Sequence, residues 1–240
     1  MKRAVKAVLI LLISVQTAWA TPSKLIRIPS GDVQPFGTFH LGIDNTTTMF
    51  LPKKSGGYNL EPVYGISAGI YDLQPLQIEA GIDLREPTDY PATWHIKVAL
   101  PEGAFNPESP AIFGGGYDLG TKEGENDYNI AYVGAAKTVS FIGRFTFGYF
   151  AGNASHLKDT NGTKSNDGII MGFDRRMPEI NERLWFGIDF QGTNSDYGAL
   201  GVGFTWSFSE NASLLLGFIR YNKETPIRKN LVSWQVDFDF

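Results

Sequence analysis

The last eleven residues of the chain, 230–240, alternate strictly between two kinds of side chain. The apolar positions are Val232, Trp234, Val236, Phe238 and Phe240, and only Ser, Gln and Asp stand between them. Because a β-strand turns successive side chains to opposite faces, this period of two predicts a strand with one apolar and one polar face. The terminus of a soluble protein usually frays into solvent. A one-sided apolar strand of about ten residues is instead typical of a barrel that crosses a membrane.

The same alternation recurs along the chain in runs that are separated by polar or Pro- and Gly-containing connections. Twelve such runs are found, over residues 38–45, 61–71, 76–86, 93–100, 111–120, 127–137, 140–152, 168–175, 183–192, 197–208, 212–221 and 230–240. A secreted β-sandwich also shows alternating strands. Run lengths near ten residues, against about five or six in soluble sheets, and the aromatic terminus favour the membrane fold. We therefore expect an all-β, transmembrane antiparallel β-barrel of about twelve strands, within a range of ten to fourteen.

The connections between the runs also alternate in length. Those that follow odd-numbered runs are mostly long and polar, whereas several that follow even-numbered runs are tight, such as residues 72–75, 138–139 and 209–211. Outer-membrane barrels have short periplasmic turns and longer external loops. An even number of strands then predicts that both termini are periplasmic.

The N-terminus has the pattern of a secretory signal peptide. Three basic residues precede an apolar run over residues 8–15, and Ala18 and Ala20 fit the cleavage rule. The run is shorter than the ~20 apolar residues of a spanning helix. We expect a signal peptide over residues 1–20, an extended periplasmic segment over 21–36 that leads into the barrel, and the outer-membrane β-barrel over 37–240.

The terminal run Val232-x-Trp234-x-Val236-x-Phe238-x-Phe240 resembles the C-terminal signature of Gram-negative outer-membrane β-barrel proteins. The resemblance implies an integral outer-membrane location and recognition of the last strand by the barrel-assembly machinery during biogenesis. It implies nothing about activity. A second pattern, Ile28-Pro29-Ser30 followed by residues 35–38, is faintly similar to the segments that precede YjbH-like exopolysaccharide-associated barrels.

The three histidines, His40, His95 and His156, are the first candidates for a catalytic base. Outer-membrane phospholipases and lipid A deacylases pair a His with a Ser two residues later, because residues i and i+2 of a strand share a face. Glycine or lysine occupies each of those positions here. The chain has no cysteine, which excludes thiolate chemistry, and it has no metal-site motif. The sequence predicts no enzymatic activity, no cofactor and no metal.

The polar faces of the strands are predicted to line the lumen, since a charge that faces lipid at mid-depth would cost a few kcal/mol. The predicted lumen-lining residues are Glu79, Asp83, Arg85, His95, Lys97, Arg144, Asp174, Arg183, Asp189 and Asp237. Small inward residues, among them Gly172, Gly201 and Gly203, are expected to leave room for a pore. The alternative is a network of charge pairs that rigidifies a closed barrel.

The leading functional hypothesis is a small passive, porin-like channel for a small polar solute, whose selectivity is set by the charged lumen. The runner-up is a non-conducting envelope or surface barrel that binds a polysaccharide or protein through long external loops at 45–60 and 153–167. A lipid-modifying enzyme ranks third. The expected partners are outer-membrane lipid, the assembly machinery and the solute. Nucleic acid is not expected, because 25 acidic side chains outnumber 21 basic ones. The sequence leaves the oligomeric state open.

Overall fold

The computed structural model describes residues 23–48, 51–60, 62–223 and 230–240. In these residues twelve antiparallel strands form a closed barrel, in which each strand pairs with its chain neighbours and β1 pairs with β12. This confirms the predicted fold class. The predicted signal peptide lies outside the described residues. No helix of the described residues is long and apolar enough to cross a membrane.

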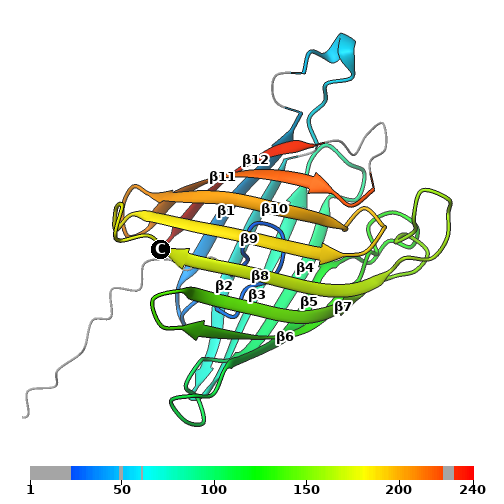
Figure 1. The fold of residues 1–240 in the computed structure, drawn as a ribbon. Helices are drawn as coiled ribbons and strands as arrows, with labels where there is room; N and C mark the ends of the chain where they lie inside the picture. Colours follow the sequence, from blue (N-terminus) through cyan, green and yellow to red (C-terminus); the bar gives the residue numbers. More distant parts are fainter. Residues whose placement is uncertain (1–22, 49–50, 61, 224–229) are drawn as a thin grey trace, which may run out of the picture.

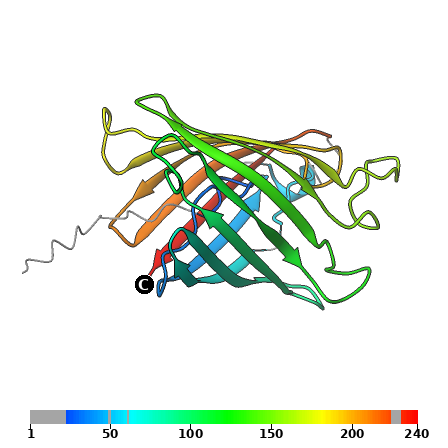
Figure 2. The ribbon, with the colours of Figure 1, turned by 90° about the horizontal axis from the view of Figure 1, so that it is seen from below.

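The strands follow one another around the barrel in chain order, inclined to its axis (Figures 1 and 2). Their bounds are β1 Phe39–Thr47, β2 Val63–Leu73, β3 Leu76–Arg85, β4 Ala92–Leu100, β5 Ala111–Leu119, β6 Ile130–Val139, β7 Gly143–Ala151, β8 Asp167–Arg176, β9 Leu184–Gly192, β10 Ala199–Ser207, β11 Ala212–Tyr221 and β12 Leu231–Asp239. A short 3-10 helix, η1 (Lys53–Ser55), lies between β1 and β2.

The terminal strand closes the barrel. In the register of β1 and β12, Leu41 lies opposite Phe238, and Asp44 lies opposite Gln235. Apolar residues therefore face apolar ones on the outer surface, and polar residues face polar ones on the inner surface. This matching of both faces fixes the register, since a slip of one residue would reverse every side chain.

The outer surface of the barrel is apolar along the strands. Large hydrophobic side chains are exposed on neighbouring strands, including Trp94, Val133, Phe147, Phe204 and Phe218. Burying one such side chain gains about 1.5–3 kcal/mol, so a continuous belt of them is unstable in water. The parity predicted for the terminal strand holds, because Ser233 and Gln235 are buried inside while Trp234 is exposed.

The structure shows which way the leucines of β11 face and where β7 begins. Three consecutive leucines, Leu214 to Leu216, fit either facing of β11 by sequence, and in the structure Leu215 turns inward while Leu216 is exposed outside. The seventh strand was predicted from residue 140, but β6 continues to Val139 and β7 begins at Gly143. Ser140 has a positive φ of 34°, so it belongs to the tight turn.

The space inside the barrel is divided. On the side of β5 to β9 it is filled by an apolar core that includes Phe113, Phe150 and Ile170. Residues 23–36, here called the inner segment, run inside the barrel as far as Gln34, and Pro35 and Phe36 are exposed (Figure 1, dark blue). Leu25, Ile26 and Ile28 of this segment are buried in the same core. These residues were expected to form an extended segment outside the barrel, and their position in the lumen is the main departure from that expectation.

Candidate functional site

The inner segment begins as a small hairpin held by one wall carboxylate. Lys24 and Pro29 form a β-bridge, and the N–H of Leu25 donates to the carbonyl of Ile28 at 2.8 Å. The turn directs three consecutive backbone N–H groups toward β9. Those of Ile26, Arg27 and Ile28 donate to Oδ2 of Asp189 at 2.9, 2.6 and 3.0 Å. Successive N–H groups that converge on one anion are a strong binding arrangement, because each bond is charge-assisted.

Inward glycines make the socket for this hairpin. A Cβ added at Gly172 would lie 2.4 Å from Cδ1 of Leu25, and one at Gly201 would lie 3.1 Å from Cγ2 of Ile26. A Cβ at Gly203 would lie 3.4 Å from Cδ1 of Ile26. These glycines were expected to leave room for a pore. Instead, the room that they leave is occupied by the inner segment.

The remainder of the inner segment is tied to four other strands. Nζ of Lys97 donates to the carbonyls of Ser23 and Asp32. The N–H of Gln34 donates to Oε2 of Glu79 at 2.8 Å. Arg144 bridges the Asp32 carboxylate at 2.6 Å and Asp174 of β8 at 3.0 Å, and Nε2 of Gln235 donates to the carbonyl of Ile26 at 3.0 Å. Charged wall residues therefore hold this segment.

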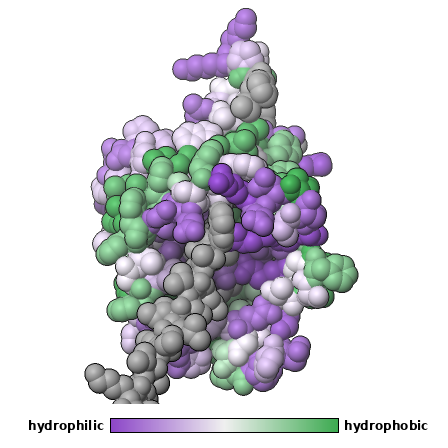
Figure 3. All heavy atoms as spheres, turned by 90° about the vertical axis from the view of Figure 1, so that its left-hand side faces the viewer, coloured by the Kyte–Doolittle hydropathy of each residue, from purple (hydrophilic) through white to green (hydrophobic). Residues whose placement is uncertain are grey.

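A cavity of about 520 Å³ remains between the inner segment and the wall formed by β1 to β4 and β10 to β12. Its lining reaches from His40 and Asp237, near the end with the C-terminus, to Arg85 and Tyr197 near the opposite end. Figure 3 looks onto the C-terminal end of the barrel and shows hydrophilic residues gathered around the opening, with hydrophobic residues outside. The cavity is thus lined by charged, aromatic and aliphatic side chains and follows the length of the lumen.

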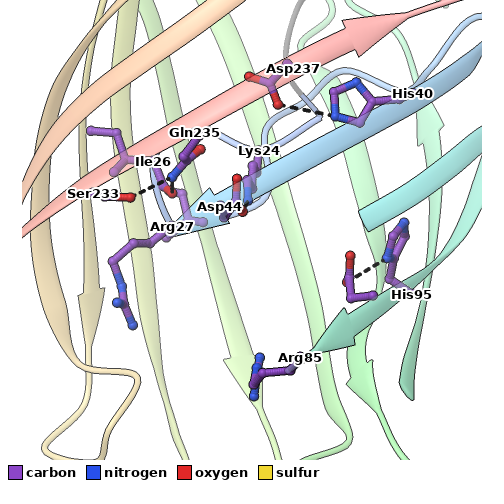
Figure 4. Close-up of polar contacts among 12 residues, drawn as sticks. Lys24, Ile26, Arg27, His40, Asp44, Arg85, His95, Ser233, Gln235 and Asp237 are labelled. Atoms are coloured by element: carbon purple, nitrogen blue, oxygen red, sulfur yellow. Dashed lines mark hydrogen bonds and ion pairs between the residues drawn. The ribbon is translucent and has the colours of Figure 1, made fainter. Parts of the chain in front are cut away.

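Charged side chains along this cavity are arranged in pairs (Figure 4). His40 contacts Asp239 at 2.9 Å and Asp237 at 3.3 Å. His95 contacts Asp83 at 3.0 Å. Lys24 of the inner segment forms an ion pair with Asp44.

Tyrosines surround the cavity at the end remote from the C-terminus. The rings of Tyr117 and Tyr197 are 6.2 Å apart, and those of Tyr128 and Tyr197 are 5.7 Å apart. Tyr197 donates to Asp118, which also pairs with Arg85 at 3.2 Å. These tyrosines are not among the predicted lumen residues. The alternation of β6 places Tyr132 on the inward face and could have indicated it. The alternation is disturbed beside Tyr117, because Asp118 has a positive φ of 50°.

The ten predicted lumen residues fall into three groups. Six line the cavity: Glu79, Asp83, Arg85, His95, Lys97 and Asp237. Three lie behind or against the inner segment: Arg144, Asp174 and Asp189. Arg183 does not lie in the lumen. It is exposed in the connection before β9, and the alternation that turns Trp185 and Asp189 inward begins only with the strand.

The histidines have carboxylate partners instead of nucleophiles. His156, in the connection between β7 and β8, donates to Asp127 of a neighbouring loop at 2.5 Å. This hydrogen bond lowers the pKa of the Asp127 carboxyl below its ordinary value. Among the described residues there is no group of three or more His, Cys, Asp or Glu side chains able to hold a metal ion.

Comparison with known proteins gives a likeness in fold alone. No family model and no curated protein matches the chain. The solved KdgM porin is 8% identical with a TM-score of 0.56, covering 84% of this chain and 99% of that chain. The KdgM porin in complex with disordered oligogalacturonate is 7% identical with a TM-score of 0.55, covering 85% and 98%. The COG4313 outer membrane channel from Pseudomonas putida F1 is 11% identical with a TM-score of 0.48, covering 89% and 100%.

The two structures with a TM-score above 0.5 are both of the KdgM porin. The chain therefore has the fold of outer-membrane porin-like β-barrels, as the alternating strands predicted.

Proposed function

We propose that this protein is a porin-like outer-membrane channel that passes a small polar solute by passive diffusion. The observation that carries the proposal is the cavity beside the inner segment, whose lining includes charged side chains from one end of the barrel toward the other. Paired charges along a narrow water-filled path select solutes by size and charge without strong binding.

The membrane location rests on the outer surface. Exposed Phe, Trp, Ile and Val side chains cover the strands, and a closed barrel satisfies its backbone hydrogen bonds internally, as a lipid environment requires. In the same proposal β12, with its outward Trp234 and Phe238, is the strand that the barrel-assembly machinery recognises, and both termini are periplasmic. Fractionation of cells into inner and outer membranes tests the location.

Selectivity is assigned to the cavity residues that do not hold the inner segment. Arg85 near one end, Asp83 with His95 in the middle, and Asp237 near the other end line the cavity. Arg144 and Asp189 are engaged with the inner segment. Arg85→Gln and Asp83→Asn are therefore expected to change ion selectivity while the barrel stays folded.

The test is conductance in planar bilayers with purified, folded protein. Discrete steps whose reversal potential in a salt gradient shifts in opposite directions for Arg85→Gln and Asp83→Asn support the channel. Steps with selectivity unchanged in both variants would reject this path. No steps above background would reject the channel itself.

A second function is favoured by one specific observation, the multiple anchoring of the inner segment within the lumen. A barrel filled in this way suits a non-conducting envelope protein that binds a partner through the long loops at 45–60 and 153–167. Absence of conductance, together with heat-modifiable migration of a folded barrel on a gel, is the result that this alternative predicts.

A further inference from the structure

Arg27 of the inner segment is placed differently from the other cavity-lining cations. Its backbone N–H is fixed by Asp189, while its side chain extends away from the segment (Figure 4) and lines the cavity. Its neighbours there are Tyr221, at the end of β11, and residues near the ends of β5 and β9. Arg27 therefore belongs to the half of the cavity remote from the C-terminus.

The guanidinium of Arg27 has hydrogen-bond donors to spare. Its carbon lies 5.2 Å from the ring centroid of Tyr221, and Nη1 reaches the hydroxyl of that residue at 3.4 Å. Within the described part of the chain no carboxylate lies within ion-pair distance of this guanidinium, and its buried Nε has no hydrogen-bond partner. A guanidinium carries five N–H donors in a fork that matches a carboxylate. By contrast, Arg85 and Arg144 are each paired.

Three carboxylates of the protein in this region are already engaged. Asp44 pairs with Lys24, and Asp118 with Arg85 and Tyr197. Asp189 accepts the three N–H groups of the hairpin. These three carboxylates already accept hydrogen bonds from other donors. The unpaired N–H groups of the Arg27 guanidinium are therefore available to a group that enters the cavity.

The surroundings of Arg27 suit the remainder of a small organic solute. Tyr221 and Tyr117 present rings to the cavity, and such rings pack against carbon skeletons while their hydroxyls form hydrogen bonds. The hydroxyl of Tyr117 accepts a hydrogen bond from Nε2 of Gln191 at 3.0 Å, and its own proton can be donated to a ligand. Aromatic rings beside convergent polar groups are typical of a small-molecule site.

We propose that the cavity around Arg27, Tyr117 and Tyr221 binds small carboxylate-bearing solutes, with the Arg27 guanidinium donating two hydrogen bonds to the carboxylate. The inner segment thus supplies the recognition residue, and the strands supply the surrounding rings. This inference deepens the proposed channel and rests on it only for the transport step. The binding step stands without conductance.

Binding is measured by calorimetry on the folded protein in detergent, with sodium gluconate and with sorbitol, which is similar in size but lacks the carboxylate. Wild type is expected to bind gluconate measurably and sorbitol at least tenfold more weakly. Arg27→Gln should weaken gluconate binding at least tenfold, and Arg27→Lys should weaken it less, because an ammonium keeps the charge but loses the fork. Heat-modifiable migration on a gel verifies that each variant is folded.

Lys24→Gln is the matched control, because it removes one positive charge from the same segment at a residue already paired with Asp44. It should change gluconate affinity less than threefold. Equal losses in Lys24→Gln and Arg27→Gln would overturn the Arg27 site in favour of general electrostatics, and equal affinity for gluconate and sorbitol would overturn it outright. Arg27-dependent binding without bilayer conductance would reject the proposed channel and keep the site.

Discussion

The carboxylate of Asp189 on β9 accepts a hydrogen bond from the backbone N–H of Arg27 at 2.6 Å, across 162 residues of sequence. The same oxygen accepts the N–H groups of Ile26 and Ile28. One buried wall residue thus satisfies three donors of the hairpin that begins the inner segment. This contact therefore joins the inner segment to the wall of the barrel.

Asp189→Ala is expected to release the inner segment. The substitution leaves three buried N–H groups without an acceptor, at a cost of about 1–3 kcal/mol for each unsatisfied group. Limited trypsin digestion measures the release, because Lys24 and Arg27 lie within the segment. The wild-type protein should resist cleavage at these residues, and Asp189→Ala should be cut there while the strands stay intact.

Asp189→Asn is the control for that experiment, since its amide oxygen still accepts hydrogen bonds but carries no charge. It should show intermediate protection. Cleavage of the wild type at the same rate as Asp189→Ala would show that the segment is not held by this contact.

Gly172→Ala is expected to disturb the apolar socket. The new Cβ would lie 2.4 Å from Cδ1 of Leu25, and overpacking of this kind costs about 1–3 kcal/mol. The double variant Gly172→Ala with Leu25→Ala should recover part of that loss, because the shortened side chain makes room for the methyl group. Urea unfolding in detergent gives the coupling between the two positions. Strict additivity of the two single effects would contradict the contact.

Arg144→Ala is expected to act on stability more than on selectivity. Arg144 neutralises Asp32 of the inner segment and Asp174 of β8, and breaking a buried pair by removing one partner costs about 3–5 kcal/mol. Arg175→Ala provides the comparison, because Arg175 forms an exposed pair with Glu179 that is worth under about 1 kcal/mol. Similar unfolding midpoints for the two variants would contradict the burial of the Arg144 cluster.

The contact between Asp127 and His156 predicts a pH dependence of the loop between β7 and β8. The hydrogen bond from His156 lowers the pKa of Asp127 in the folded protein, so this contact stabilises the loop above the ordinary aspartate pKa of about 3.9 and is lost as pH falls through the lower folded value. Hydrogen–deuterium exchange of residues 152–166 should accelerate, relative to the intrinsic rate, below about pH 4. Asp127→Asn should lack this acidic transition, and an identical transition in both proteins would exclude Asp127 as its origin.

The barrel was predictable from the sequence because lipid contact imposes a rule on every strand. Trp234 must face outward and Gln235 inward, and the same local requirement repeats on neighbouring strands. The pairing of β12 with β1 follows once the strands are known, since closure removes the exposed edges.

The inner segment was not predictable in this way. Residues 23–36 contain two prolines and no periodic pattern, and the positions that receive them are single residues on distant strands, such as Gly172 and Asp189. A glycine on the inner face is compatible with an open pore or with a packed side chain. The charge of Asp189 is compatible with a lumen wall or with a backbone turn held against it. Only the assembled barrel decides between these alternatives.

In the proposed function, the inner segment narrows a conducting lumen. Single-channel conductance in planar bilayers tests this directly when wild type is compared with a variant that carries Leu25→Ser, Ile26→Ser and Ile28→Ser together. These changes remove roughly 1.5–3 kcal/mol of apolar burial at each position and leave the strands unchanged. We predict small discrete steps for wild type and clearly larger steps for the variant. Steps of equal size in the two proteins, or no steps in either, would contradict the account.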